Sequence, residues 1–135
     1  MSTKTIYTSY YGRNESHENA ISISASAPKS FKGPHMTILA PSWELLNGYK
    51  DGKLTKAQYT TKYIELLESR NLTPQIIYDS IPHGSILLCY EKPGDFCHRR
   101  SLAEWLEKNL NVTINEWVSE AEQKKSDLLD DVLDF

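Results

Sequence analysis

The sequence has few cysteines, no long apolar run and little net charge, and each shortage argues against a class of protein. Two cysteines in 135 residues are too few for a disulfide framework, so we expect both to be thiols. No apolar run approaches the roughly 20 residues of a membrane-spanning helix, and the first residues do not resemble a secretory signal. A net charge of −3 provides no broad basic face for duplex nucleic acid. Together these shortages predict a cytoplasmic protein that is not inserted into a membrane.

Length and charge predict one domain followed by an acidic tail. The 135 residues, of which 39% are hydrophobic and 24% charged, leave room for one ordinary globular core. Residues 119–135 contain six acidic residues and two lysines, a net charge of −4, which leaves about +1 on residues 1–118. We therefore expect a single α/β domain over residues 1–118 and a distinct acidic tail over residues 119–135.

The most informative stretch runs from Ser85 to Leu110 and reads SILLCYEKPGDFCHRRSLAEWLEKNL. Its short apolar run, residues 86–90, is typical of a strand that is buried on both faces. A Pro-Gly turn follows, and from about His98 apolar residues recur at helical spacing. The pattern predicts a central strand, a tight loop and a helix. That loop would lie at the carboxyl end of the strand, where α/β sheets bind their ligands.

Other segments predict the remaining strands and helices. Capping signals predict helices that begin after Ser42, Thr55 and Thr73. The order of elements predicts an α/β three-layer sandwich with a mixed, partly parallel sheet and flanking helices, in which the helix after residue 97 crosses over to a last parallel strand. Strands or extended segments are expected at residues 5–11, 20–24, 36–40 and 111–117, with a loop at residues 26–35 that reaches over the site.

The central stretch also resembles a known family. Residues 87–91 (LLCYE), 97–100 (CHRR) and 102–106 (LAEWL) resemble the core motif of the domain of unknown function 488, and weaker agreement extends over about residues 4–117. The resemblance implies a small intracellular α/β domain without an established activity. Many members have Gly-His-Ser after the first strand and Asp-Val-Arg at the end of the second. This chain has Tyr10-Tyr11-Gly12 and Ile21-Ser22-Ile23-Ser24 there, which indicates a divergent member.

The predicted start of the helix presents a candidate anion site. Arg99 and Arg100, together with unpaired backbone N–H groups, can hold a phosphate. Neighbours on a helix point about 100° apart, so we expect one arginine to bind the ligand and the other to be structural, with Glu91 or Glu104 as its partner. Lys32 in the preceding loop is a further candidate ligand for the anion.

Three candidate catalytic residues flank the same loop. His98 can act as a general acid or base, with Glu91 as its orienting carboxylate or as a second base, or it can hydrogen-bond a loop carbonyl. Cys97 is either a reactive thiol at a helix start or a small packed residue. Cys89 is expected in the core. A zinc site from Cys89, Cys97, His98 and a distant His35 or His83 lacks paired ligand spacing, so no metal or cofactor is predicted.

Two classes of function follow from these residues. The leading hypothesis is that the protein binds a phosphate-bearing nucleotide or nucleic-acid end at the Cys-His-Arg-Arg site, and whether it also processes that ligand stays open. An alternative is a thiol-dependent enzyme that uses Cys97. The competing hypothesis is a non-enzymatic accessory protein that its tail recruits to a replication clamp. We expect most of the aromatic residues to lie in the core, and one or two near the loops to be able to stack a nucleobase; the candidates are Tyr7, Tyr10, Tyr11, Trp43 and Tyr49.

The acidic tail has an apolar face of its own. Leu128, Leu129, Val132 and Leu133 recur at helical spacing between aspartates, ahead of Phe135. The segment is either a last helix packed on the body or a peptide that docks into a groove of a partner. It is similar to the C-terminal clamp-binding peptides of large tailed bacteriophages. In the docking interpretation Leu129, Leu133 and Phe135 anchor the partner.

A truncation after Lys125 tests the tail. If residues 126–135 form a docking peptide, the truncated protein should melt at the temperature of the full chain and lose capture of a purified sliding clamp in a pull-down. If they form part of the core, the loss of four apolar side chains should lower stability by several kcal/mol, a large share of the ~5–15 kcal/mol of a small domain. A melting temperature many degrees lower would contradict the docking interpretation.

Overall fold

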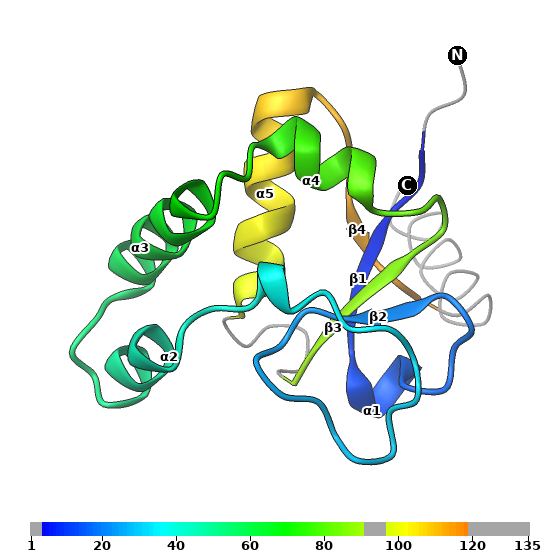
Figure 1. Ribbon diagram of the computed structural model, residues 1–135, viewed down its shortest axis with the longest axis horizontal. Helices are drawn as coiled ribbons and strands as arrows, with labels where there is room; N and C mark the ends of the chain where they lie inside the picture. The colour runs from blue at the N-terminus through cyan, green and yellow to red at the C-terminus, as the bar shows by residue number, and fades with distance from the viewer. Residues whose placement is uncertain (1–3, 91–96, 119–135) are drawn as a thin grey trace, which may run out of the picture.

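The computed structural model describes residues 4–90 and 97–118, and its strands form one parallel sheet (Figure 1). The strand order is β2-β3-β1-β4, and each neighbouring pair is parallel. The central strand predicted from the apolar run is confirmed, because β3 lies between β1 and β2 and all its residues are buried. The strands are β1 (Tyr7–Tyr10), β2 (Ala20–Ser22), β3 (Ile86–Cys89) and β4 (Asn115–Glu116).

The helices begin where the capping signals predict. Ser42 caps α2, Thr55 caps α3 through a capping box with Gln58, and Thr73 caps α4 with Pro74 at its first position. Each side-chain oxygen accepts a backbone N–H that the first helical turn leaves without a partner. The helices are α1 (Tyr11–Asn14), α2 (Trp43–Lys50), α3 (Lys56–Ser69), α4 (Pro74–Ser80) and α5 (His98–Leu110), with a 3₁₀ turn, η1, at Thr37–Leu39.

Two hydrophobic clusters cover the two faces of the sheet and make the fold an α/β sandwich. Successive side chains of β3 alternate between them, as a strand requires. Leu87 packs with residues of α2 to α5, whereas Ile86 and Leu88 pack with Tyr11 of α1 and Phe31 of the loop after β2. The helices α2 to α5 therefore form one thick layer on the Leu87 face of the sheet. The opposite layer is thin, because within the described residues it consists of α1 and irregular chain.

The structure differs from the sequence predictions in three places. The described sheet is entirely parallel rather than mixed. Both outer strands are shorter than expected. Residues 37–39 form a 3₁₀ turn instead of extended chain, because the backbone N–H groups of Leu39 and Ala40 bond to carbonyls three residues earlier. Once those donors are satisfied locally, they are not available to a ladder.

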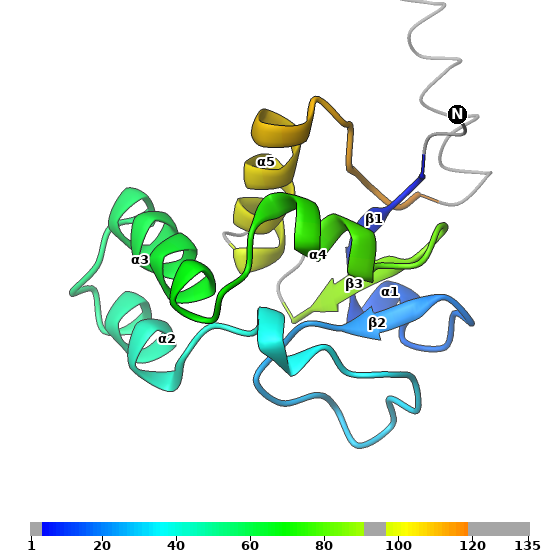
Figure 2. The same ribbon diagram turned by 45° about the horizontal axis from the view of Figure 1, so that its top comes forward.

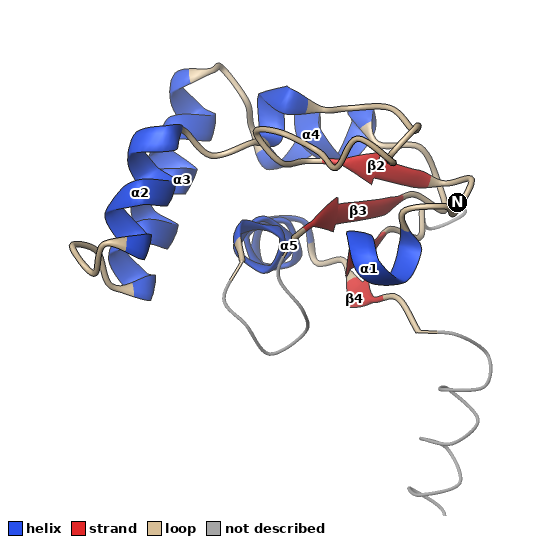
Figure 3. Ribbon diagram, turned by 90° about the horizontal axis from the view of Figure 1, so that it is seen from below, coloured by secondary structure: helices blue, strands red, loops and turns tan. Residues whose placement is uncertain are grey.

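The carboxyl ends of β2 and β3 point toward α5 and the α2–α3 pair. Figure 2 shows β2 and β3 side by side, and Figure 3 shows their arrowheads directed at the region where these helices lie. A ligand crevice is expected at this edge in open parallel sheets. The described helices do not include one that is both long and apolar enough to cross a bilayer.

Candidate ligand site at the carboxyl ends of β2 and β3

A cavity of about 580 Å³ lies at this edge of the sheet. Its wall is built from several segments of the chain. The end of β2 and the residues after it meet the end of β3, the start of α5 and the inner side of α2 and α3. The lining residues are Ser24, Ala25, Ser26, Pro41, Trp43, Leu46, Tyr49, Lys50, Tyr59, Cys89, Tyr90, Cys97 and His98.

Aromatic side chains form much of the cavity wall. Trp43 opens α2 and is 59% exposed, and Tyr90 follows β3 and is 51% exposed. Tyr49 and Tyr59 meet edge to face, with ring centroids 5.6 Å apart. Large apolar side chains are normally buried, so two exposed rings in one cavity form a surface suited to a flat ligand. Lys50, in the last turn of α2, also lines the cavity.

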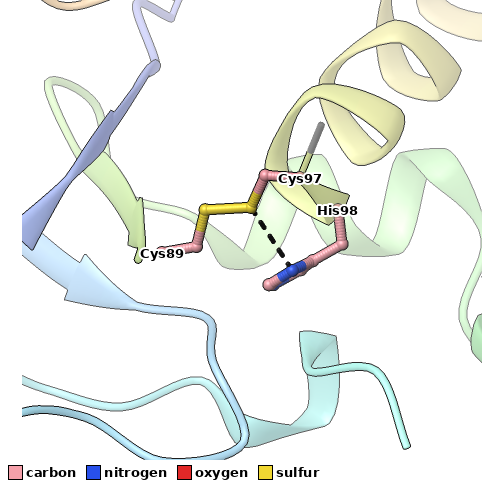
Figure 4. A group of neighbouring side chains, drawn as sticks. All are labelled: Cys89, Cys97 and His98. Atoms are coloured by element: carbon pink, nitrogen blue, oxygen red, sulfur yellow. Dashed lines mark hydrogen bonds between the residues drawn. A yellow bond between two sulfur atoms is a disulfide. The ribbon is translucent and has the colours of Figure 1, made fainter. Parts of the chain in front are cut away.

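The floor of the cavity contains a disulfide bond between Cys89 and Cys97, so the expectation that both cysteines are thiols is wrong. Cys89 ends β3, and Cys97 is the N-cap residue of α5. The end of β3 and the start of α5 lie side by side, which brings together two cysteines that are eight residues apart. Figure 4 shows the bond, with His98 beside it. Spacing alone does not reveal such a meeting, because it depends on how the chain turns between the strand and the helix.

His98 is buried and its orientation is set by a backbone carbonyl. The Ile23 carbonyl oxygen can only accept, so Nε2–H of His98 donates to it at 2.7 Å. Nδ1 then carries the lone pair and lies 3.6 Å from Cys97 Sγ. Burial lowers the pKa of His98 to about 4, opposed by the bond to Ile23. The alternative in which His98 hydrogen-bonds a loop carbonyl is therefore confirmed, and the acid–base role stays a prediction.

The two arginines belong to an internal network. Arg99 is 1% exposed. Its Nε donates to Oε1 of Glu116 at 2.9 Å, and its second terminal nitrogen donates to Oε2 at 3.3 Å. The remaining terminal nitrogen donates to Cys89 Sγ at 2.8 Å. The structural partner is thus Glu116 of β4, rather than Glu91 or Glu104 as expected.

Arg100 completes the same network. Its guanidinium donates to Thr8 Oγ1 at 2.9 Å and to the Ile114 carbonyl at 3.0 Å, and Thr8 in turn donates to Glu116. These contacts tie α5 to β1 and to the chain around β4. Neither arginine lines the aromatic cavity, and their predicted phosphate binding stays a prediction.

The other predicted site residues lie away from the cavity or outside the described residues. Lys32 is exposed, and its ammonium donates to the Lys29 carbonyl at 3.3 Å. Glu91 and the tail residues Leu129, Leu133 and Phe135 fall outside the described residues. The residues that motif reasoning missed are Ser24, Lys50, Tyr59 and Tyr90 of the cavity wall. No local signal marks them, because each comes from a different element.

The fold and the site define an α/β sandwich protein with a cavity at the carboxyl edge of a parallel sheet. A family model described as DUF488-N3a, the active DUF488-N3 subclade, matches residues 6–110. The chain therefore belongs to the DUF488 family, as the motif around residues 87–106 indicated. No curated protein and no solved structure gives a significant match.

The lowered pKa of His98 predicts that the protein loses stability in mild acid. Between about pH 6.5 and pH 4 the unfolded chain binds a proton at His98 that the folded chain does not, so stability falls as pH falls through this window. We expect roughly 2 kcal/mol to be lost between about pH 7.5 and pH 5, measured by urea unfolding. His98→Gln, which keeps an amide donor for Ile23, should lack this component. An equal loss in both proteins would contradict the assignment.

The network of Arg99 predicts a structural role that mutation can separate from ligand binding. Arg99→Ala leaves Glu116 without its guanidinium, and breaking such a pair costs up to 3–5 kcal/mol when both partners are buried. Because Glu116 is 24% exposed, we expect a loss at the low end, about 3 kcal/mol, by chemical denaturation. Lys108→Ala on the exposed side of the same helix should change stability by less than about 0.5 kcal/mol. An Arg99→Ala protein of unchanged stability would instead favour a ligand role.

Proposed function

We propose that the protein binds a phosphate-bearing nucleotide, or the end of a nucleic-acid strand, in the aromatic cavity at the carboxyl ends of β2 and β3. The observation that carries the proposal is the pairing of exposed rings, Trp43 and Tyr90, with Lys50 in one cavity. The volume of about 580 Å³ is within the roughly 300–1,000 Å³ of small-molecule sites.

The base of the ligand would stack on the aromatic wall. Each base stacked on an aromatic side chain contributes about 1–3 kcal/mol, whatever its sequence. Trp43 is the strongest candidate, because its large ring is more than half exposed although it lies at the cavity. Tyr49 and Tyr59 hold each other edge to face, which gives the wall a fixed shape. A rigid wall favours binding, because little side-chain freedom remains to be lost.

The phosphate would be held by Lys50 and the amino end of α5. A lysine is a common point-charge ligand of phosphate. The residues at the start of α5, Cys97 and His98, line the cavity, so the positive end of a 13-residue helix contributes to the potential there. The sequence hypothesis assigned this task to Arg99 and Arg100. Their contacts with Glu116, Thr8 and Ile114 favour Lys50 instead.

Ser24 and Ser26 line the wall next to the end of β2. A serine hydroxyl can both donate and accept, so these two residues supply hydrogen bonds of the kind that a base edge or a ribose needs. Ser24 already accepts from the Tyr11 hydroxyl at 3.0 Å. This bond fixes the hydroxyl at the cavity while leaving it a donor for a ligand.

Calorimetric titration with nucleoside monophosphates and a short oligonucleotide carrying a 5′ phosphate tests the proposal. Trp43→Ala should weaken binding by roughly fivefold to a hundredfold, the equivalent of one lost stacking contact. Lys50→Gln should weaken it and reduce its dependence on salt. The matched controls are Ile76→Ala, an exposed apolar residue on α4, and Lys53→Gln, an exposed lysine just after α2; both should bind normally.

Two results would contradict the proposal. One is the absence of binding by any member of the panel to the unmodified protein. The other is binding that is equally strong in Trp43→Ala and Lys50→Gln, which would put the ligand elsewhere. If Arg100→Ala alone abolished binding without loss of stability, the original arginine site would be correct instead.

A further inference from the structure

Three metal-ligating side chains meet at the floor of the aromatic cavity. Sγ of Cys89, Sγ of Cys97 and a ring nitrogen of His98 all lie within 4.8 Å of one another. Figure 4 shows the two cysteines arriving from β3 and from the start of α5, with the imidazole turned toward Cys97 Sγ. Two thiolates and an imidazole are a ligand set that zinc prefers.

We infer that the reduced protein binds one Zn²⁺ ion through Cys89, Cys97 and His98, with a fourth coordination position open to the cavity. The disulfide is the oxidised form of the same site. The inference does not depend on nucleotide binding, because it follows from the three ligands alone.

The conversion between the two forms is balanced in electrons and protons. A cellular or added dithiol gives two electrons and two protons to the Cys89–Cys97 bond, which becomes two thiols, and the dithiol becomes a disulfide. Zn²⁺ then displaces the two thiol protons and is held by two thiolates. The sulfurs must move from bonding distance to roughly 3.8 Å apart, since each Zn–S bond is about 2.3 Å in a tetrahedral site. The Cα atoms already lie 7.3 Å apart, so side-chain rotation can provide this separation.

The surroundings of the three ligands suit a metal. Nε2–H of His98 donates to the Ile23 carbonyl, which leaves Nδ1 as the ligating atom, and metal-bound histidines commonly make this kind of second hydrogen bond. Arg99 donates to Cys89 Sγ, a bond that stabilises a thiolate. The carboxylate of Glu116 balances the charge of Arg99. A cation at the neighbouring site therefore faces a paired guanidinium rather than an isolated one.

The open position distinguishes this site from a structural zinc site. Structural sites use four protein ligands, whereas catalytic sites use three and leave a place for water or substrate. All three ligands line the cavity of about 580 Å³. The argument from sequence took a distant His35 or His83 as the fourth protein ligand and discounted the site because the set lacks paired ligand spacing. An ion that is held by three protein ligands and by a ligand from the cavity does not need a fourth protein ligand.

Metal titration of the full-length protein tests the inference. The protein is reduced with dithiothreitol, desalted without oxygen and titrated with Co²⁺ and then Zn²⁺ against a chromophoric chelator. We expect one equivalent per chain, a thiolate-to-cobalt charge-transfer band and the intense visible bands of tetrahedral cobalt. The oxidised protein should bind none. Cys89→Ser and Cys97→Ser should each abolish the charge-transfer spectrum or halve it, and His98→Ala should weaken zinc binding at least tenfold.

The control is His83→Ala, which removes an exposed histidine away from the cavity and should bind zinc normally. As a second measurement that uses only the unmodified protein, Zn²⁺ should protect both thiols of the reduced protein from iodoacetamide. The inference is overturned if both thiols react at the same rate with and without zinc, if His98→Ala binds as tightly as the parent, or if dithiothreitol cannot open the bond in the folded protein. None of these results alters nucleotide binding measured with the oxidised protein.

Discussion

The buried guanidinium of Arg99 constrains the site more than any other side chain described. A charge in the interior must be paired and hydrogen-bonded, because its desolvation is otherwise too costly. Arg99 meets this requirement with Glu116 of β4 and with Cys89 at the end of β3. Since it also lies in the first turn of α5, it sets where that helix begins relative to the sheet. The positions of Cys97 and His98 follow from this placement.

The cavity combines a fixed floor with a wall contributed by distant segments. The floor is set by β3, α5 and the Arg99 network. The wall comes from α2 and α3, which belong to the long connection between β2 and β3 and pack on one cluster with the sheet. A change in how α2 packs would therefore alter the position of Trp43 and Lys50 without disturbing His98.

The disulfide makes the redox state of the protein part of the chemistry of the site. With the bond closed, the floor offers sulfur in an uncharged form, and the neutral imidazole of His98 lies beside it. With the bond open, the site would contain two thiols and the lone pair of His98 Nδ1, and these atoms lie within 4.8 Å of one another. Arg99 donates to the sulfur of Cys89, and Cys97 is the N-cap residue of α5.

Much of the fold follows from local patterns. The apolar run at residues 86–90 predicted a central buried strand, and Ser42, Thr55 and Thr73 marked the starts of three helices, because capping depends on side chains within one turn of chain. The same locality explains the errors. Whether a short segment such as residues 37–39 pairs in a sheet, and whether every strand of the sheet runs parallel, depends on contacts with distant strands.

For the residues of the candidate site, too, local patterns predicted some features and tertiary packing decided the others. The sequence by itself determined that Cys97, His98, Arg99 and Arg100 begin a helix after a central strand, since the turn and the helical period are local. Only the tertiary structure decided their tasks. Glu116 is 17 residues from Arg99, Ile23 is 75 residues from His98, and the cavity joins residues that lie in or next to β2, α2, α3, β3 and α5. Partners this far apart in the chain are chosen by how the layers pack, and no pattern within a single element contains that information.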